Sequence, residues 1–324
     1  MKAYILVDGA IEQTKVATEV HTAHTAGKLM WVDLGPRDTE ADALLSETFR
    51  LHPLVIEGIW LGRSVPKLND YGSYLHLAME GPRRAPEGAQ TQLALWTLDV
   101  VLGATFLITH HDDLVLVEAI APVLARTPRL LEEGPAWLLH RILDHVVDRF
   151  LPVIDRLGGR LDEVERQVIE DATDAQDREL TPTIFGLKRS LQDLCRIASH
   201  QREILEQLAR GGVEALPPAT LPYYRDVSIH FVRVAELADT YRDRVLNVLD
   251  ANFSVQSNVM NRSIKRLTVI STVLLPLNLM AGIYGMNFRR MPGLYSMYGF
   301  PVTLGLMALL AAGVLVGFKR RGWM

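Results

Sequence analysis

The segment that decides the fold is RSIKRLTVISTVLLPLNLMAGIYGMNF, residues 262–288, near the C-terminus. It begins with three basic residues in five positions, and the following eighteen residues, Leu267–Tyr284, carry no charge. A helix of this length and composition can cross the hydrocarbon core of a membrane. A second uncharged segment, Met297–Phe318, ends at the basic tripeptide Lys319–Arg321. The sequence therefore predicts two membrane helices, joined by a tight loop that begins with Gly-Met-Asn.

The first of these helices carries a stripe of mostly polar and small residues. Steps of three and four connect Ser257, Asn261, Ile264, Thr268, Ser271, Leu275, Asn278, Gly282 and Gly285. This period places them on one face of the helix, and inside a membrane such a face contacts protein or water. The stripe indicates either hydrogen bonding to a neighbouring helix or the lining of a pore. Because one helix cannot enclose a pore, the second interpretation requires several copies of the chain.

Four motifs follow one another through this part of the chain. They are Ala281–Phe288 (AGIYGMNF), Met291-Pro292, Tyr298–Pro301 (YGFP) and Phe318–Trp323 (FKRRGW). In this order, at the end of the first of two C-terminal membrane helices, they resemble the CorA family of magnesium channels. The resemblance covers the whole chain and is strongest after Pro222. It implies an α+β membrane protein with an N-terminal cytoplasmic α/β domain, a long helical stalk, two C-terminal transmembrane helices and assembly into a homopentamer.

The resemblance also implies which residues contact the ion. Gly285, Met286 and Asn287 match the family's selectivity filter, where a ring of amide oxygens would hold Mg²⁺ through its water shell. The pore-lining positions would be Asn261, Ile264, Leu267, Thr268, Ser271, Leu275 and Asn278. Among these, Ile264, Leu267 and Leu275 resemble an apolar constriction that closes by losing its water.

Acidic residues on the stalk are candidates for a regulatory Mg²⁺ site. In the family, magnesium bound between cytoplasmic domains holds the channel shut, and Asp226 matches one of the acidic positions. Asp250 is a second carboxylate at a family-like place. The partner acid of relatives follows a strand, where this chain has Gly81–Arg84 instead, so that only Glu80 and Glu87 are candidates for the partner. The geometry of regulation is left open by this departure.

Composition and charge limit the other possibilities. The chain has 324 residues and a net charge of −4, which argues against a nucleic-acid partner. The single cysteine, Cys195, excludes an intrachain disulfide and suits a reducing compartment. Residues 1–30 contain no apolar segment long enough for a signal peptide. The connecting loop carries two basic residues, Arg289 and Arg290, and the helix ends away from this loop carry more. This excess predicts an inner (plasma) membrane protein with both termini in the cytoplasm.

Three domains are expected. Residues 1–135 form a cytoplasmic α/β domain, residues 136–266 a cytoplasmic helical domain that includes the start of the stalk helix, and residues 267–324 the transmembrane domain. In the last of these, the helices cover about 267–284 and 298–318, with a periplasmic loop at 285–297 and a basic tail. In the first, apolar runs predict strands at 4–7, 29–34, 71–79, 93–101 and 105–110, and a helix at 38–49.

Several histidines and glycines have a chemical and a structural interpretation. His110-His111-Asp112-Asp113 contains metal-ligating residue types, but a polar turn between a strand and a helix is the preferred interpretation. Adjacent histidines in a strand point to opposite faces and chelate poorly. His21 and His24 are expected in a polar loop. Gly158-Gly159 lies within a helical pattern and is not expected to bind phosphate.

The chain is expected to be a transporter and not an enzyme. It contains no Walker loop, no His-Glu-x-x-His and no Gly-x-Ser-x-Gly segment, so the membrane potential would drive entry. The expected cargo is Mg²⁺, with Co²⁺ and Ni²⁺ as surrogates. A Zn²⁺ transporter of the same fold and a membrane-anchored enzyme are the alternatives. The expected partners are further copies of the chain, membrane lipid and divalent ions.

Overall fold

The computed structural model describes residues 1–62, 66–83, 93–174, 180–212, 215–286 and 297–323. The chain divides into two compact units. The first unit comprises residues 1–166 and 179–249, and the second comprises residues 167–178 and 250–324. Among the positions named in the sequence analysis, Arg84, Glu87 and residues 287–292 lie outside the described residues.

The first unit is built on a seven-stranded sheet with the order β2-β1-β3-β7-β6-β5-β4. Its strands are β1 (Lys2–Val7), β2 (Ala10–Thr14), β3 (Met30–Leu34), β4 (Lys67–Asp70), β5 (Tyr74–Arg83), β6 (Ala94–Gly103) and β7 (Phe106–His111). Strands β3 and β7 pair in parallel, and the other described pairings are antiparallel. The predicted strands at 4–7, 29–34, 93–101 and 105–110 are confirmed.

Two details of the sheet differ from the prediction. The strand expected from Tyr71 begins at Tyr74, because Asp70 Oδ1 accepts the Gly72 N–H at 2.8 Å and closes a turn there. Strand β2 has the sequence AIEQT, in which no apolar run indicates a strand. It forms because the β1 edge pairs with it from Ala3 to Val7.

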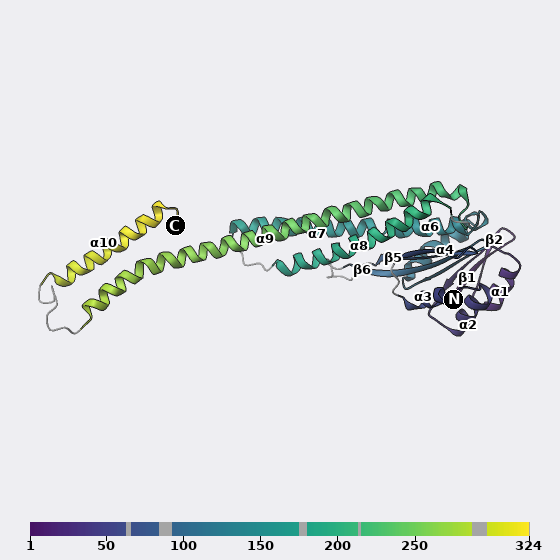
Figure 1. The fold of residues 1–324 in the computed structure, drawn as a ribbon, viewed down its shortest axis with the longest axis horizontal. Coiled ribbons are helices and arrows are strands. Elements are labelled where there is room, and N and C mark those ends of the chain that lie inside the picture. The colour runs from purple at the N-terminus through teal and green to yellow at the C-terminus, as the bar shows by residue number, and fades with distance from the viewer. Residues whose placement is uncertain (63–65, 84–92, 175–179, 213–214, 287–296, 324) are drawn as a thin grey trace. The chain divides into compact units, whose positions relative to one another are not determined.

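Four short helical elements cover one face of the sheet (Figure 1). They are α1 (Ala17–Thr25), α2 (Thr39–Ala43), the π-helical turn η1 (Leu44–Thr48) and α3 (Pro53–Leu61). Their apolar side chains share one buried cluster with alternate strand residues, among them Ile5, Val32 and Ile108. The predicted helix at 38–49 is confirmed, and Asp38 caps it by accepting the Ala41 N–H at 2.7 Å.

Helix α1 corrects one expectation, because His21 and His24 lie in this helix and not in a polar loop. Val20 and Ala23, three residues apart, are its buried residues. The His24 ring centre lies 4.9 Å from that of Phe49, and burial lowers the pKa of His24. An apolar face of two residues among polar neighbours is too narrow for the hydrophobic pattern to indicate a helix.

The opposite face of the sheet is covered by later helices. They are α4 (Leu114–Arg126), α5 (Arg129–Glu132) and α6 (Pro135–Asp148), of which α6 contacts β5, β6 and β7. Three longer helices follow: α7 (Phe150–Asp174), α8 (Thr181–Arg210) and, after the short turn η2 (Pro218–Thr220), α9 (Leu221–Tyr284).

Within the first unit, α7 packs closely against α9. The ring centres of Phe150 and Phe231 lie 5.2 Å apart, edge to face. A Cβ on Gly158 would lie 2.7 Å from the ring of Tyr241, so only glycine leaves room for this ring. The helical environment predicted for Gly158 is confirmed.

The second unit contains the C-terminal part of α9 and helix α10 (Gly299–Arg320). Both helices are long and apolar enough to cross a membrane by length and composition. Among the described residues from Asp250 onward, Val269 is the only buried hydrophobic one. Lys265 Nζ lies 5.9 Å from the ring centre of Trp323, a cation–π contact between α9 and the segment that follows α10. The structure thus has the predicted α/β portion, long helix and two apolar C-terminal helices.

Candidate functional site

The predicted pore residues lie on the part of α9 that belongs to the second unit. Six of them are exposed and Thr268 is half-buried; the six are Asn261, Ile264, Leu267, Ser271, Leu275 and Asn278. Leu275 keeps 73% of its surface exposed and Leu267 keeps 66%. A face with such apolar exposure is a contact surface for something other than water.

Two threonine hydroxyls on this part of α9 have partners in their own helix. Thr268 Oγ1 donates to the Ile264 carbonyl at 2.8 Å, and Thr272 Oγ1 donates to the Thr268 carbonyl at 2.7 Å. Such bonds satisfy a hydroxyl without any neighbouring helix. For Thr268, therefore, the interpretation as a hydrogen-bonding contact between helices is not needed to explain a polar residue here.

Helix α9 ends at the start of the Gly-Met-Asn motif. The Gly285 N–H donates to the Ala281 carbonyl at 2.9 Å, and the Met286 N–H donates to the Ile283 carbonyl at 3.2 Å. These bonds close the last helical turn, so the two described residues of the motif have a defined position at the helix end. Asn287 follows them but lies outside the described residues.

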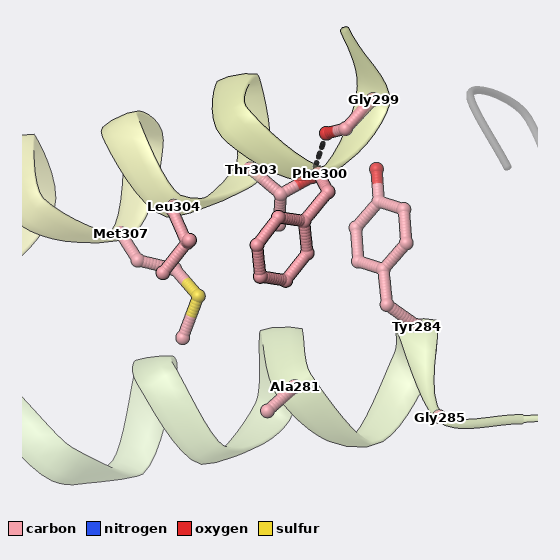
Figure 2. Close-up of a pocket in the computed structure, with 8 residues that line it drawn as sticks. All are labelled: Ala281, Tyr284, Gly285, Gly299, Phe300, Thr303, Leu304 and Met307. Atoms are coloured by element: carbon pink, nitrogen blue, oxygen red, sulfur yellow. Dashed lines mark hydrogen bonds between the residues drawn. The ribbon is translucent and has the colours of Figure 1, made fainter. Parts of the chain in front are cut away.

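A cavity of about 500 Å³ lies beside this helix end, between α9 and α10 (Figure 2). Ala281, Tyr284 and Gly285 line it from α9 and its end. The side chains of Phe300 and Met307 line it from α10. The helix end before Asn287 is therefore bordered on this side by apolar side chains of the second helix.

The stalk acids predicted to bind a regulatory ion are both exposed. Asp226 Oδ1 lies 4.0 Å from His230 Nε2, one turn further along α9. Ligand atoms of His230, Asp144 and Asp148 all lie within 4.8 Å of one another, so they form a cluster that could hold a metal ion. The sequence analysis missed Asp144 and Asp148, although their four-residue spacing on α6 was an available signal.

Glu80, one candidate for the partner acid of the regulatory Mg²⁺ site, contacts helix α8. The Gln201 side chain of α8 donates to the Glu80 carbonyl at 2.9 Å. Burial raises the pKa of the Glu80 carboxyl, while Arg196 and His200 lower it to a smaller extent. A partly buried, more readily protonated carboxyl is a poorer ligand for a hydrated cation than the exposed Asp226.

The predicted polar turn at His110–Asp113 begins only at Asp112, because both histidines belong to β7. They point to opposite faces as predicted: His110 packs edge-on against Trp60 of α3, and His111 Nε2 lies 3.0 Å from Asp33 Oδ1. They therefore do not form one metal site.

The chain resembles known proteins along nearly its whole length. A family profile described as "CorA-like Mg2+ transporter protein" matches residues 26–320. YfjQ of Bacillus subtilis is 33% identical over 295 residues, which cover 90% of this chain and 89% of that protein. The cobalt/magnesium transport protein CorA of Thermotoga maritima is 29% identical over 306 residues, or 91% of this chain and 83% of that protein.

A solved structure shows the same fold. The CorA magnesium transporter from Methanocaldococcus jannaschii, 20% identical, matches with a TM-score of 0.80 over 100% of this chain and 98% of that chain. The profile, the relatives and the order of elements agree along the α/β portion, the long helix and the two apolar helices. The chain therefore belongs to the family of CorA-like Mg²⁺ transporter proteins.

Proposed function

We propose that the protein is a channel for divalent cations, with Mg²⁺ as its main cargo and Co²⁺ and Ni²⁺ as further ions. The observation that supports this most directly is the exposed face of α9 that leads to Gly285 and Met286. Among the described residues, this face has no covering element in its own chain. Five copies arranged around one axis would turn these faces toward each other and enclose a pore.

The selectivity filter is formed by Gly285, Met286 and Asn287. Mg²⁺ releases its water reluctantly and binds proteins through retained waters. The amide oxygen of Asn287 from each copy accepts hydrogen bonds from that water shell. A Cβ on Gly285 would lie 3.2 Å from the Ala281 carbonyl oxygen, so glycine keeps the helix end compact. Asn278, about two turns deeper, supplies a second ring of amides.

The gate is the apolar ring of Ile264, Leu267 and Leu275. In a pore narrow enough for these side chains to meet, water leaves and ion passage stops. When the ring opens, the membrane potential drives entry. It contributes ~2.3 kcal/mol per charge per 100 mV, so about twice that for a divalent ion.

Regulation uses cytoplasmic Mg²⁺ bound at the stalk acids. Asp226 and Asp250 are exposed carboxylates, and Mg²⁺ prefers oxygen ligands. The cluster of Asp144, Asp148 and His230 beside Asp226 adds ligands on the same face. Replacing Asp226 and Asp250 together by Asn should weaken the protection from protease that Mg²⁺ gives to the stalk, and unchanged protection across a Mg²⁺ titration would count against both residues.

In the cell, the chain lies in the inner membrane with both termini in the cytoplasm. This orientation keeps residues 1–135 and 136–266 as cytoplasmic domains, and places the loop at 285–297 outside. The basic residues around Lys265 and Lys319 then contact the anionic cytoplasmic lipid surface.

Ion uptake into proteoliposomes tests the function directly. Mg²⁺ and Zn²⁺ are offered separately, each with an imposed membrane potential or an imposed proton gradient. We expect Mg²⁺ uptake that follows the potential. Uptake of Zn²⁺ that follows only the proton gradient would support the zinc transporter of the same fold instead. No uptake of either ion by correctly inserted protein would overturn the channel.

A further inference from the structure

A second site is indicated in the first unit, at the carboxyl ends of the parallel strands β3 and β7. After β3 the chain passes to the face that carries α2, η1 and α3, and after β7 it passes to α4 on the opposite face (Figure 1). Neighbouring parallel strands whose connections leave to opposite faces create a crevice at their carboxyl ends, and this is where open α/β sheets bind ligands.

The structure has a cavity of about 620 Å³ at this place. It is lined by Asp33 and Leu34 at the end of β3, by His111 at the end of β7 and by Val117 of α4. Its volume lies within the range of small-molecule sites and corresponds to roughly twenty water molecules at about 30 Å³ each. The cavity is therefore large enough for an organic ligand.

The floor of the cavity holds a buried polar group that lacks a partner. The His111 side chain is only 3% exposed, and its Nδ1 has no hydrogen-bond partner among the described residues. Its Nε2 lies 3.0 Å from Asp33 Oδ1 without forming a hydrogen bond, and that oxygen accepts from Thr109 Oγ1 at 2.8 Å. A buried imidazole whose ring nitrogens lack hydrogen bonds is uncommon, and it distinguishes this end of the sheet from a fully satisfied core.

Charged side chains of both signs line the cavity, and Lys2 stands opposite Asp33 in the pairing of β1 with β3. Lys2 and Lys15 supply ammonium groups from β1 and from the end of β2, while Asp33 and Glu118 supply carboxylates from β3 and α4. The first turn of α4 is already capped by Asp113, so the cations for an anionic group come from the lysines. A ligand that matches these side chains carries both an anionic group and hydrogen-bond donors.

We propose that this cavity binds a nucleoside phosphate. Its phosphate pairs with Lys2 and Lys15, its hydroxyl or amino groups donate to the carboxylates of Asp33 and Glu118, and its flat ring lies over the part of the lining that Leu34 and Val117 form. A bare metal ion fits less well, because two lysines line the cavity. Among the described residues, the cluster of metal-ligand atoms lies elsewhere, at Asp144, Asp148 and His230.

Isothermal titration of the purified full chain in detergent tests this proposal, with AMP, ATP and inorganic phosphate as separate probes. We expect AMP or ATP to bind, and the Lys2→Glu/Lys15→Glu variant to bind about ten-fold more weakly. The control is Lys28→Glu, an exposed lysine of the same unit that does not line this cavity. It should bind as the wild type does.

Three outcomes would overturn the proposal. The first is no heat with either nucleotide at millimolar concentration. The second is an equal loss of affinity in Lys28→Glu, since this would indicate attraction by overall charge and not by the cavity. The third is inorganic phosphate binding as tightly as AMP, because the nucleoside would then make no contact. Since all substituted lysines are exposed, the variants are expected to fold.

Discussion

The two units of the chain bury large apolar side chains to very different extents. In the first unit, large apolar side chains such as Trp31, Trp96, Phe150 and Phe231 are less than 2% exposed. In the second unit, Leu275 and its neighbours are exposed, and Val269 is the only buried hydrophobic among the described residues from Asp250 onward. The first unit finds its partners within one chain. The second requires lipid and further copies of the chain to cover it.

Helix α9 contains a part with buried apolar residues and a part with exposed apolar residues in one continuous helix. Up to Leu249, buried residues recur at steps of three, four and seven, which keep to one face of the helix: Val227, Phe231, Val234, Ala238, Val245 and Val248. Beyond this point apolar residues persist, but burial within the chain almost ceases. The helix itself does not change, so the difference comes only from what packs against it.

The largest expected effect comes from the Gly-Met-Asn motif that follows α9. Asn287→Ala should abolish Mg²⁺ uptake in proteoliposomes, because the ring of amide oxygens is lost, and should leave assembly and thermal unfolding unchanged. Asn69→Ala, at an exposed position in β4, is the matched control and should transport normally. Normal uptake by a correctly assembled Asn287→Ala protein would remove the proposed filter.

Two substitutions that shorten a side chain test the difference in burial between the two units by its effect on stability. Phe231→Ala removes a ring with 0% exposure, and should cost about 3–5 kcal/mol in the free energy of unfolding of the first unit. Leu275→Ala, which removes a side chain that is 73% exposed, should change it by no more than about 0.5 kcal/mol. Chemical unfolding in detergent measures both. Equal losses would show that the two regions do not differ as described.

Adjacent glycines of α7 provide a finer test inside the first unit. Gly158→Ala places a methyl group against the Tyr241 ring and should cost about 1–3 kcal/mol. Gly159→Ala meets no atom within 4 Å and should stabilise the helix by up to ~1 kcal/mol, because alanine loses less backbone entropy. The two melting temperatures should shift in opposite directions. A shift in the same direction would place the packing of α7 on α9 in doubt.

The smallest effect concerns the dependence of stability on pH. Burial raises the pKa of Glu80 above 4.5, so the folded chain keeps a proton that the unfolded chain releases. This contribution is complete below pH 4.5 and is lost as the pH rises through the raised value. Relative to Glu80→Gln, the wild type should therefore lose stability as the pH rises from 4.5 through the raised pKa of Glu80. Glu203→Gln, at an exposed position of α8, should show no such trend.

Much of this fold could be predicted from the sequence, because its signals are local. For the uncharged run from Leu267 and for the strand at 105–110, the local residue pattern is enough to predict the element. Strand β2 could not be predicted, since only pairing with β1 makes it a strand. Helix α1 could not be predicted because its apolar face consists of Val20 and Ala23 alone.

The candidate sites likewise differ in whether their residues are close together in the sequence. The Gly-Met-Asn filter is contiguous in sequence, and a resemblance can indicate it. The cluster of Asp144, Asp148 and His230 joins α6 to α9, and the nucleotide cavity joins β1, β3, β7 and α4. A single segment of such a site can carry a local signal, as the four-residue spacing of Asp144 and Asp148 does, but which distant elements come together becomes visible only once the chain is folded.

The parallel pairing of β3 with β7 has a consequence for biosynthesis. Trp31 Nε1 donates to Thr109 Oγ1 across 78 residues of sequence. At a synthesis rate of ~5–20 residues per second, β3 waits roughly 4–16 s for β7 to leave the ribosome. During this time its outer edge is an unpaired template for other strands. The nascent chain should therefore depend on a holding chaperone early, well before its membrane helices are made.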